Sequence, residues 1–281
     1  MATIALLQMT SSSDIQRNLD FVSAAFRQLA EQAAPVDMVL LPENWASYGN
    51  RDITRESRQS REQQAAIMAH VSALARQYRT WIIAGTIPFK YQSEQQPWAC
   101  CPVFDDRGQL VAEYRKIHLF DAMIADGHRL YRESATYRHG NTLTVVNTPI
   151  GRVGLSVCYD LRFAEMYQRL RVMGAEVMVA PAAFTRPTGE AHWELLNRAR
   201  AVENACYMLS PAQVGSHDDS RQTWGHSMVI EPWGRVQGCL ENETGWLMGD
   251  INRARVRAMR QTMPNQEHRI QTVQRWALKT Q

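Results

Sequence analysis

This sequence has no long apolar run, no cysteine framework and little net charge. None of its segments approaches the roughly 20 consecutive apolar residues that a membrane span requires. Its first residues, MATIALLQM, lack the basic region and the small-residue cleavage site of a signal peptide. The formal net charge is only +3 and the arginines are scattered, which argues against a strongly basic surface for nucleic acid or lipid. We therefore expect a cytoplasmic protein with no nucleic-acid partner and no membrane partner.

Cysteine and histidine also lack the spacings of structural sites. The five cysteines show no repeated spacing and stand at Cys100, Cys101, Cys158, Cys206 and Cys239. Their odd number argues against a disulfide framework, and there is no CxxC pair of the kind that binds zinc. None of the eight histidines lies in an HExxH motif or in a Cys/His cluster. We therefore expect a reducing compartment and no structural metal.

The apolar pattern alternates between strands and helices along the chain. It predicts strands at 3–8, 37–41, 81–86, 99–104, 110–116, 153–157, 176–180 and 206–210, and a final antiparallel set at 227–231, 235–239 and 245–250. Helices are predicted at 15–32, about 56–78, from 162 to about 173 and about 191–204, whereas residues 117–142 look irregular. No segment resembles a linker. The pattern therefore predicts one α/β domain over residues 1–281, with a C-terminal tail at about 265–281.

Cys158 lies where a strand pattern meets a helix pattern, in GRVGLSVCYDLRFAEMYQRLRVMG. The free N–H groups and the positive dipole end of a helix favour a thiolate, which is the nucleophilic form of cysteine. The alternative is a buried packing cysteine, because free cysteine is among the most buried residue types. The neighbouring Asp160 and Arg162 favour the first interpretation, since a purely structural strand end has little need of them.

Three buried strands end at a proline, in VLLPEN (39–44), VMVAPAAF (177–184) and YMLSPAQ (207–213). Open α/β sheets place their sites at the carboxyl ends of strands. If the strands run parallel, Glu43, Cys158, residues 182–185 and Gln213 share one edge. The prolines also have a simpler interpretation, which is that they only terminate strands. This interpretation is compatible with a site at the shared edge.

Two kinds of base are compatible with a Cys158 nucleophile. One is a histidine, as in many thiol enzymes, and the candidates are His118, His192 and His226. The other is a carboxylate, because Glu43 emerges where a buried strand stops and Lys116 closes the strand pattern EYRKIHLF. In that arrangement the carboxylate takes the thiol proton and the ammonium stabilises an oxyanion. The residues alone leave both arrangements open.

Five segments in family order resemble the nitrilase superfamily of carbon–nitrogen hydrolases. They are LLPENW (41–46), YRKIHLFD (114–121), CYDLRF (158–163), AAFTRPTGEAHWELLNRARAVEN (182–204) and WGHSMVIEPWG (224–234). The resemblance extends to about residue 252. It implies a four-layer α-β-β-α sandwich, a homodimer or higher homo-oligomer formed through outer helices, and no metal or organic cofactor.

The resemblance also implies a role for each catalytic residue. It implies that Glu43 is the general base, Lys116 the oxyanion-stabilising lysine and Cys158 the nucleophile. A second glutamate used by many members matches Glu133 in YRES, although the loop DAMIADGHRLYRES departs from the usual pattern of the family. The backbone N–H of Tyr159 is the expected second oxyanion donor.

Within the superfamily, the chain resembles most the deaminated glutathione amidases, and next the ω-amidases that act on α-ketoglutaramate. CYDLRF argues against a nitrile substrate. The resemblance therefore implies hydrolysis of the terminal amide of a small keto-acid amide that also carries a carboxylate. Arg162 is the candidate anchor for that carboxylate because its planar fork suits it. A structural ion pair of Arg162 with Glu165 or Asp160 is the alternative, and Thr185 is a further substrate-binding candidate. A Cys–His thiol hydrolase and a non-catalytic interaction protein remain the competing functions.

Overall fold

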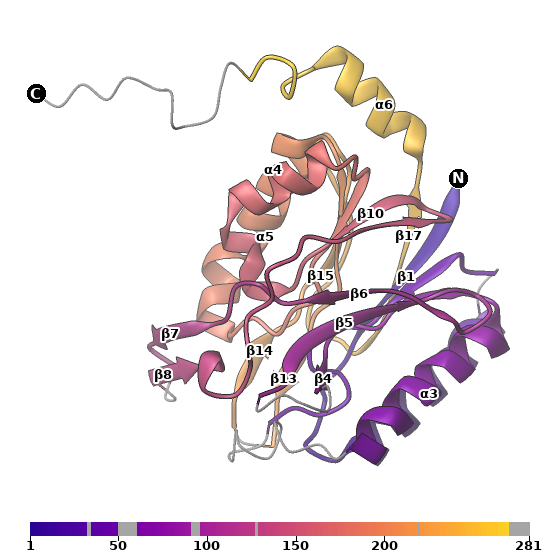
Figure 1. Cartoon of the computed structure of the whole chain (residues 1–281), viewed down its shortest axis with the longest axis vertical. Helices are drawn as coiled ribbons and strands as arrows, with labels where there is room; N and C mark the ends of the chain where they lie inside the picture. The colour runs from indigo at the N-terminus through magenta and orange to yellow at the C-terminus, as the bar shows by residue number, and fades with distance from the viewer. Residues whose placement is uncertain (33–34, 50–60, 91–95, 127–128, 219, 270–281) are drawn as a thin grey trace, which may run out of the picture.

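Two β-sheets lie face to face between two layers of helices (Figure 1). The computed structural model describes residues 1–32, 35–49, 61–90, 96–126, 129–218 and 220–269. Its helices are α1 (Ile15–Gln32), α3 (Arg61–Tyr78), α4 (Ala164–Val172), α5 (Arg186–Asn204) and α6 (Arg253–Thr262), with short 3-10 helices η1 (Glu133–Ala135) and η2 (Cys158–Arg162). The expected α-β-β-α sandwich is confirmed. Over the described part of the chain, no helix is both long and apolar enough to cross a membrane.

The first sheet has seven strands in the order β17-β1-β2-β3-β5-β4, with β6 also paired to β5. Its strands are β1 (Ala2–Gln8), β2 (Met38–Leu40), β3 (Trp81–Ile83), β4 (Ile87–Phe89), β5 (Trp98–Phe104), β6 (Leu110–Arg115) and β17 (Gly245–Ile251). β1, β2 and β3 run parallel, and the other pairings are antiparallel. The carboxyl ends of the central parallel strands therefore meet at one edge.

The second sheet has six strands in the order β16-β15-β12-β11-β10-β9. They are β9 (Val145–Thr148), β10 (Gly151–Leu155), β11 (Val177–Val179), β12 (Tyr207–Ser210), β15 (Ser227–Ile230) and β16 (Val236–Leu240). Its three central strands, β10, β11 and β12, are again parallel. The structure thus repeats a central parallel arrangement in both sheets, and the two sheets face each other across a shared core.

β1 shows how one strand contributes to two cores. Ile4 and Leu6 belong to the cluster that includes the second sheet, whereas Ala5 and Leu7 belong to the cluster with α1 and α3. Successive side chains of a strand point to opposite faces, so this near-continuous apolar strand has both faces covered. All four side chains are fully buried. The apolar run of the sequence is therefore explained by burial between two layers.

The sequence-based prediction was wrong in several places, and one of them is the strand β9, which was not predicted. Residues 117–142 are not irregular, because they contain the hairpin of β7 (Asp121–Ile124) and β8 (Arg129–Arg132), followed by η1. The short strand β4 and the hairpin of β13 (Val214–Ser216) and β14 (Gln222–Trp224) were not predicted. The predicted final antiparallel set is not one unit, because β17 pairs with β1 in the first sheet. Residues 56–60 of a predicted helix and 270–281 of the predicted tail lie outside the described residues.

Candidate functional site

The carboxyl ends of strands from both sheets bring the candidate catalytic side chains together. Glu43 follows β2, Lys116 directly follows β6, and Cys158 opens η2 after β10. The Glu43 Oε2 atom accepts a hydrogen bond from the backbone N–H of Ala183, which follows β11, at 2.9 Å. The Gln213 side chain donates to the Glu43 carbonyl oxygen at 2.9 Å. The shared edge expected from the proline-ended strands is therefore present.

Lys116 lies between two carboxylates. Its Nζ atom is 2.8 Å from Glu43 Oε1 and 2.9 Å from both carboxylate oxygens of Glu133. The backbone N–H of Phe120 also donates to Glu133 Oε2, at 2.6 Å. The side chains of Lys116 and Glu43 are 1% and 5% exposed, so water screens this interaction little.

Burial and charge act against each other at Lys116. Burial alone favours the neutral amine, but the carboxylates of Glu133 and Glu43 outweigh it and hold the pKa of Lys116 well above its usual range. At Glu133, burial raises the carboxyl pKa against the opposing charge of Lys116. The arrangement therefore keeps an ammonium in a nearly dry site, where it interacts strongly with any developing negative charge.

The Cys158 thiol is held in its protonated form. Burial, followed by the negative charge of Glu43, raises the pKa of Cys158 well above its usual value, although Lys116 acts in the opposite sense. The expectation that a helix dipole favours the thiolate is wrong here. Cys158 opens only the five-residue 3-10 helix η2, and α4 begins at Ala164, so the dipole is weak and burial dominates. Attack by this sulfur therefore needs a base.

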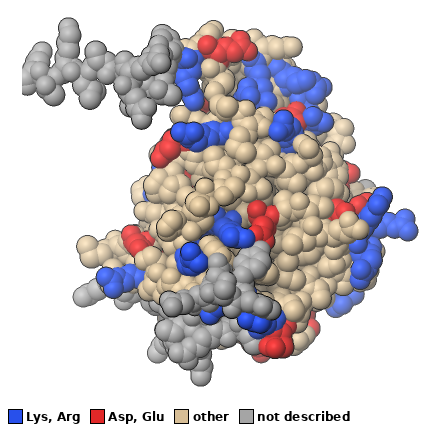
Figure 2. Space-filling view, viewed as in Figure 1, with Lys and Arg blue, Asp and Glu red and all other residues tan. Residues whose placement is uncertain are grey.

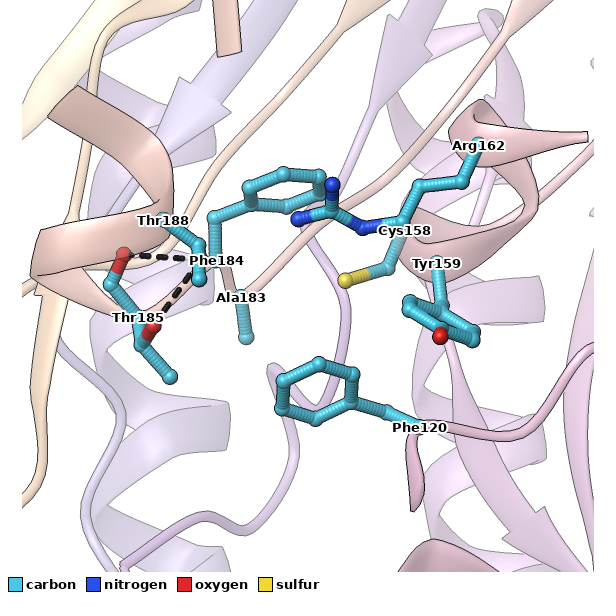
Figure 3. A pocket seen from close by; sticks show the side chains of 8 residues that line it. All are labelled: Phe120, Cys158, Tyr159, Arg162, Ala183, Phe184, Thr185 and Thr188. Carbon is cyan, nitrogen blue, oxygen red and sulfur yellow. Dashed lines mark hydrogen bonds between the residues drawn. The ribbon is translucent and has the colours of Figure 1, made fainter. Parts of the chain in front are cut away.

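Cys158 also has an unusual backbone conformation. Its φ angle is +48°, in the left-handed region that side chains other than glycine rarely adopt. Its N–H donates to the Pro181 carbonyl oxygen at 3.0 Å, which connects the turn after β10 to the end of β11. In Figure 3 the sulfur points into the pocket, between the rings of Phe120 and Phe184. The strained turn thus aims the side chain at the cavity.

The three candidate histidine bases have other partners. His118 Nδ1 is 2.7 Å from Asp160 Oδ1, and its ring stacks on Phe163. His192 Nδ1 accepts from the Arg162 guanidinium at 3.3 and 3.4 Å, and His226 stacks on Trp224. By contrast, the negative charge of Glu43 adds to burial in raising the pKa of the Cys158 thiol. The geometry therefore favours the carboxylate arrangement over a Cys–His pair.

A small pocket lies in front of Cys158. Its walls combine aromatic rings, hydroxyl groups and one cation, from Phe120, Cys158, Tyr159, Arg162, Ala183, Phe184, Thr185 and Thr188. The hydroxyl groups of Thr185 and Thr188 lie 2.8 Å apart. The chemistry of this lining suits a small ligand with an apolar body and an anionic end.

Arg162 is the cation of this pocket. Its guanidinium carbon lies 5.7 Å from the Tyr159 ring centroid and 5.4 Å from that of Phe184, and Figure 3 shows it reaching over the pocket from η2. The alternative ion pair with Glu165 or Asp160 is wrong, because Arg162 contacts His192 and Asp160 contacts other donors. Arg162 is therefore held by aromatic faces and an imidazole, which leave a full positive charge beside the cavity.

Sequence reasoning missed Phe120, Thr188 and Asp160 as contributors to this site. Thr188 lines the pocket from the first turn of α5, but threonine in a helix gives no signal in a single sequence. Asp160 was noted as a polar neighbour of Cys158 and as a possible ion-pair partner of Arg162, whereas its carboxylate is fully buried and accepts from Tyr114, His118 and Val157. Those partners lie up to 46 positions away, so no local spacing reveals them. Among the described residues, no cluster of His, Cys, Asp and Glu has the arrangement of a metal site.

Comparison with known proteins gives consistent matches. The model of the carbon-nitrogen hydrolase family matches residues 3–261. The deaminated glutathione amidase of Yersinia enterocolitica is 40% identical over 268 residues, which is 95% of this chain and 92% of that protein. The crystal structure of the C. elegans NitFhit protein has a TM-score of 0.86 at 36% identity, covering 96% of this chain and 66% of that one.

A structure of a mutant amidase from Nesterenkonia sp. AN1 also matches, with a TM-score of 0.78 at 25% identity. The match covers 94% of this chain and 98% of that one. That structure shows acrylamide added to the active-site cysteine of the Nesterenkonia protein.

Proposed function

This chain belongs to the carbon-nitrogen hydrolase family, within the nitrilase superfamily, and from that premise we propose that it hydrolyses the amide bond of deaminated glutathione with Cys158 as the nucleophile. The observation that carries the proposal is the buried Lys116 ammonium between Glu43 and Glu133, beside a thiol that opens onto a pocket. Buried charges are costly unless they are used or well paired. In this proposal Glu43 is the base, Lys116 stabilises the oxyanion, and Cys158 is the nucleophile.

The proposed acylation step begins at Glu43. Its carboxylate takes the thiol proton as the Cys158 sulfur attacks the amide carbon, which the raised thiol pKa makes necessary. The Lys116 ammonium and the Tyr159 N–H hold the tetrahedral oxyanion, and each such donor typically lowers the barrier by about 2.7–4 kcal/mol. The C–N bond then breaks, the leaving amine takes the proton from Glu43, and a thioester remains.

In the proposed deacylation step, water takes the place of the leaving amine. A carboxylate, Glu43 or Glu133, takes a proton from water as the water oxygen attacks the thioester carbon. The C–S bond breaks, the sulfur regains its proton, and the free acid leaves. Neither step requires a metal or an organic cofactor.

Two substrates fit this mechanism and share one acyl group. Deaminated glutathione releases cysteinylglycine and α-ketoglutaramate releases ammonia, and both leave the same keto acid on the enzyme. The carboxylate of that keto acid is the proposed partner of Arg162, and Thr185 contributes a hydroxyl group. We favour deaminated glutathione because the Yersinia enterocolitica relative carries that activity in its name. α-Ketoglutaramate, an ω-amidase substrate, is the second candidate.

Mass spectrometry of products tests this function. The purified protein is incubated with deaminated glutathione, α-ketoglutaramate, a neutral amide and a nitrile. We expect the keto acid from the first two substrates and no product from the nitrile. Absence of hydrolysis of every amide would remove the proposed function and leave a non-catalytic binding protein.

Two variants separate the carboxylate mechanism from a Cys–His mechanism. Glu43→Gln keeps the shape of the side chain but removes the proton acceptor, so kcat should fall by roughly 10²–10⁴-fold. His118→Ala should lower kcat much less. The reverse order of effects would assign the base to His118.

The remaining features of the proposal concern the assembly and the compartment. We propose a single domain over residues 1–281 that acts on a small amide as a homodimer or higher homo-oligomer. The free state of the five cysteines supports a reducing compartment such as the cytoplasm. Sedimentation of the purified protein measures the oligomeric state directly.

A further inference from the structure

A single carboxylate connects the two segments that carry Lys116 and Cys158. Asp160 is fully buried, and its two oxygens accept four hydrogen bonds. Oδ2 accepts from the Tyr114 hydroxyl at 2.7 Å and from the Val157 N–H at 2.9 Å. Oδ1 accepts from the N–H of His118 at 3.0 Å and lies 2.7 Å from His118 Nδ1. Each of these four hydrogen bonds therefore comes from a residue within two positions of Lys116 or Cys158.

The donors flank the site on both sides. Tyr114 and His118 stand two positions before and two positions after Lys116, and the Tyr114 hydroxyl also accepts from the Ile117 N–H at 3.0 Å. Val157 directly precedes Cys158. Lys116 follows a strand of the first sheet and Cys158 a strand of the second, so the bonds from Tyr114 and His118 to Asp160 cross from one sheet to the other.

A ring contact of His118 adds to the hydrogen bonds that join the two segments. Its ring lies parallel to that of Phe163, at 3.6 Å between centroids and 7° between planes. Phe163 follows η2 directly, so the ring contact repeats the link that Asp160 makes by hydrogen bonds. Cys158 needs such support, because its positive φ angle is strained and persists only where the surroundings determine it.

We propose that Asp160 is a positioning residue, which sets the distance between the Lys116 ammonium and the Cys158 sulfur by clamping Tyr114, His118 and Val157. The proposal rests on the proposed function, in which both groups act on one amide carbon. Asp160 itself touches neither group's reacting atom. A displacement of about 1 Å at a reacting group can lower a rate by 10²-fold, so the clamp is expected to act on kcat.

Asp160→Asn tests the clamp with little change of size. The amide nitrogen cannot accept, so one of the two pairs of donors must lose its acceptor. The matched control is Glu176→Gln, a carboxylate that accepts from Arg253 and from the Arg152 N–H at the other end of β11. Both variants remove a well-bonded carboxylate, but only Asp160 lies beside the catalytic segments.

We expect Asp160→Asn to lower kcat about 100-fold with KM within about threefold of wild type. Iodoacetamide alkylation of Cys158, followed by mass spectrometry of its peptide, should require a higher pH, because Lys116 is no longer held beside the sulfur while Glu43 remains. Glu176→Gln should leave kcat and the alkylation profile unchanged. A kcat of Asp160→Asn within threefold of wild type would overturn the proposal. A loss of kcat that only matches the fraction of unfolded protein, with an unchanged pH profile of Cys158 alkylation, would overturn it as well.

A second pair of variants decides the matter if Asp160→Asn does not fold. His118→Asn retains a donor close to the position of Nδ1, whereas His118→Leu removes it. We expect His118→Asn to keep a kcat several-fold higher than that of His118→Leu, and equal values would contradict the clamp. Alkylation of Cys158 needs no substrate, so it tests the positioning role of Asp160 separately from the proposed function. A shifted pH profile of alkylation, together with no hydrolysis of any amide by the wild-type protein, would support the positioning role and contradict the proposed function.

Discussion

Glu43 and Glu176 are buried carboxylates at opposite ends of β11, and each pairs with a cation in a different way. Glu43 bonds to Ala183 beyond the carboxyl end, and its partner Lys116 is 1% exposed. Glu176 precedes the strand, and its partner Arg253 is 50% exposed on α6. Around α6, at the top of Figure 2, basic side chains lie next to acidic ones at the surface. Only in the first pair are both side chains, Glu43 and Lys116, buried away from water.

This difference indicates what each end of the strand does. Removing two charges from water is expensive, and a half-exposed ion pair stabilises a fold more cheaply than a buried one. The Glu176 pair therefore suits a structural role, as one of the contacts that attach α6. The buried cluster of Glu43, Lys116 and Glu133 is best explained by chemistry that needs strong electrostatic interactions in a dry pocket. Substitutions at the two ends should therefore have separable effects on activity and stability.

The largest expected effect is that of Cys158→Ala. The substitution should abolish amide hydrolysis, because no other atom replaces the attacking sulfur. The fold should remain intact, since little volume is removed, and circular dichroism should show a melting temperature near that of wild type. Cys239→Ala, at an exposed cysteine, is the control and should retain full activity. More than a trace of hydrolysis by Cys158→Ala would show that the mechanism is wrong.

Lys116→Met should be nearly as damaging to kcat. The substitution removes the ammonium from between Glu43 and Glu133 and leaves two buried carboxylates without their shared cation. Loss of one oxyanion donor typically lowers kcat by about 10²–10³-fold. Steady-state kinetics of the folded variant measures this effect. A kcat near that of wild type would place the oxyanion elsewhere.

Arg162→Lys should have an intermediate effect that depends on the substrate. An ammonium does not reproduce a bidentate contact with a carboxylate, so kcat/KM should fall by roughly ten- to a hundredfold, mainly through KM. The loss should be large for deaminated glutathione and small for a neutral amide. Equal losses on both substrates would assign Arg162 to holding the fold through Tyr159 and Phe184.

Glu176→Gln should change stability alone, by about 1 kcal/mol because Arg253 is half-exposed. Burial raises the pKa of Glu176, but hydrogen bonds from Arg253 and the Arg152 N–H outweigh it and lower the pKa below its usual 4.5. A lowered pKa in the folded state stabilises the protein above pH 4.5, and this contribution is lost as the pH falls through the folded pKa. Urea unfolding at pH 7 and near pH 4 should therefore show the difference from wild type shrinking at low pH. A difference that grows at low pH would contradict this assignment.

Local patterns in the sequence predicted the elements with strong periodicity. The amphipathic helix 15–32 coincides with α1, and the strand ends at Glu43 and Lys116 are where the sequence puts them. The resemblance to a family supplied Glu133, which no spacing suggested. These features are encoded within a few residues or within a motif, so one sequence is enough to find them.

Long-range features could not be predicted in the same way. The four donors of Asp160 come from both sheets, and the state of the Cys158 thiol depends on how deeply it is buried beside Glu43. The hairpin β7–β8 was missed because four-residue strands carry too few side chains for a clear alternation. Burial and cross-sheet contacts therefore needed the structure.

The most direct test of the account is a side-by-side measurement of kcat/KM for deaminated glutathione and α-ketoglutaramate on the unmutated enzyme. In the proposed mechanism both substrates leave the same acyl group on Cys158, so the ratio reports only the leaving-group side of the site. We predict a clear preference for deaminated glutathione. A preference for α-ketoglutaramate would contradict the proposed substrate and assign the enzyme to the ω-amidases, and no turnover of either would contradict the proposed function itself.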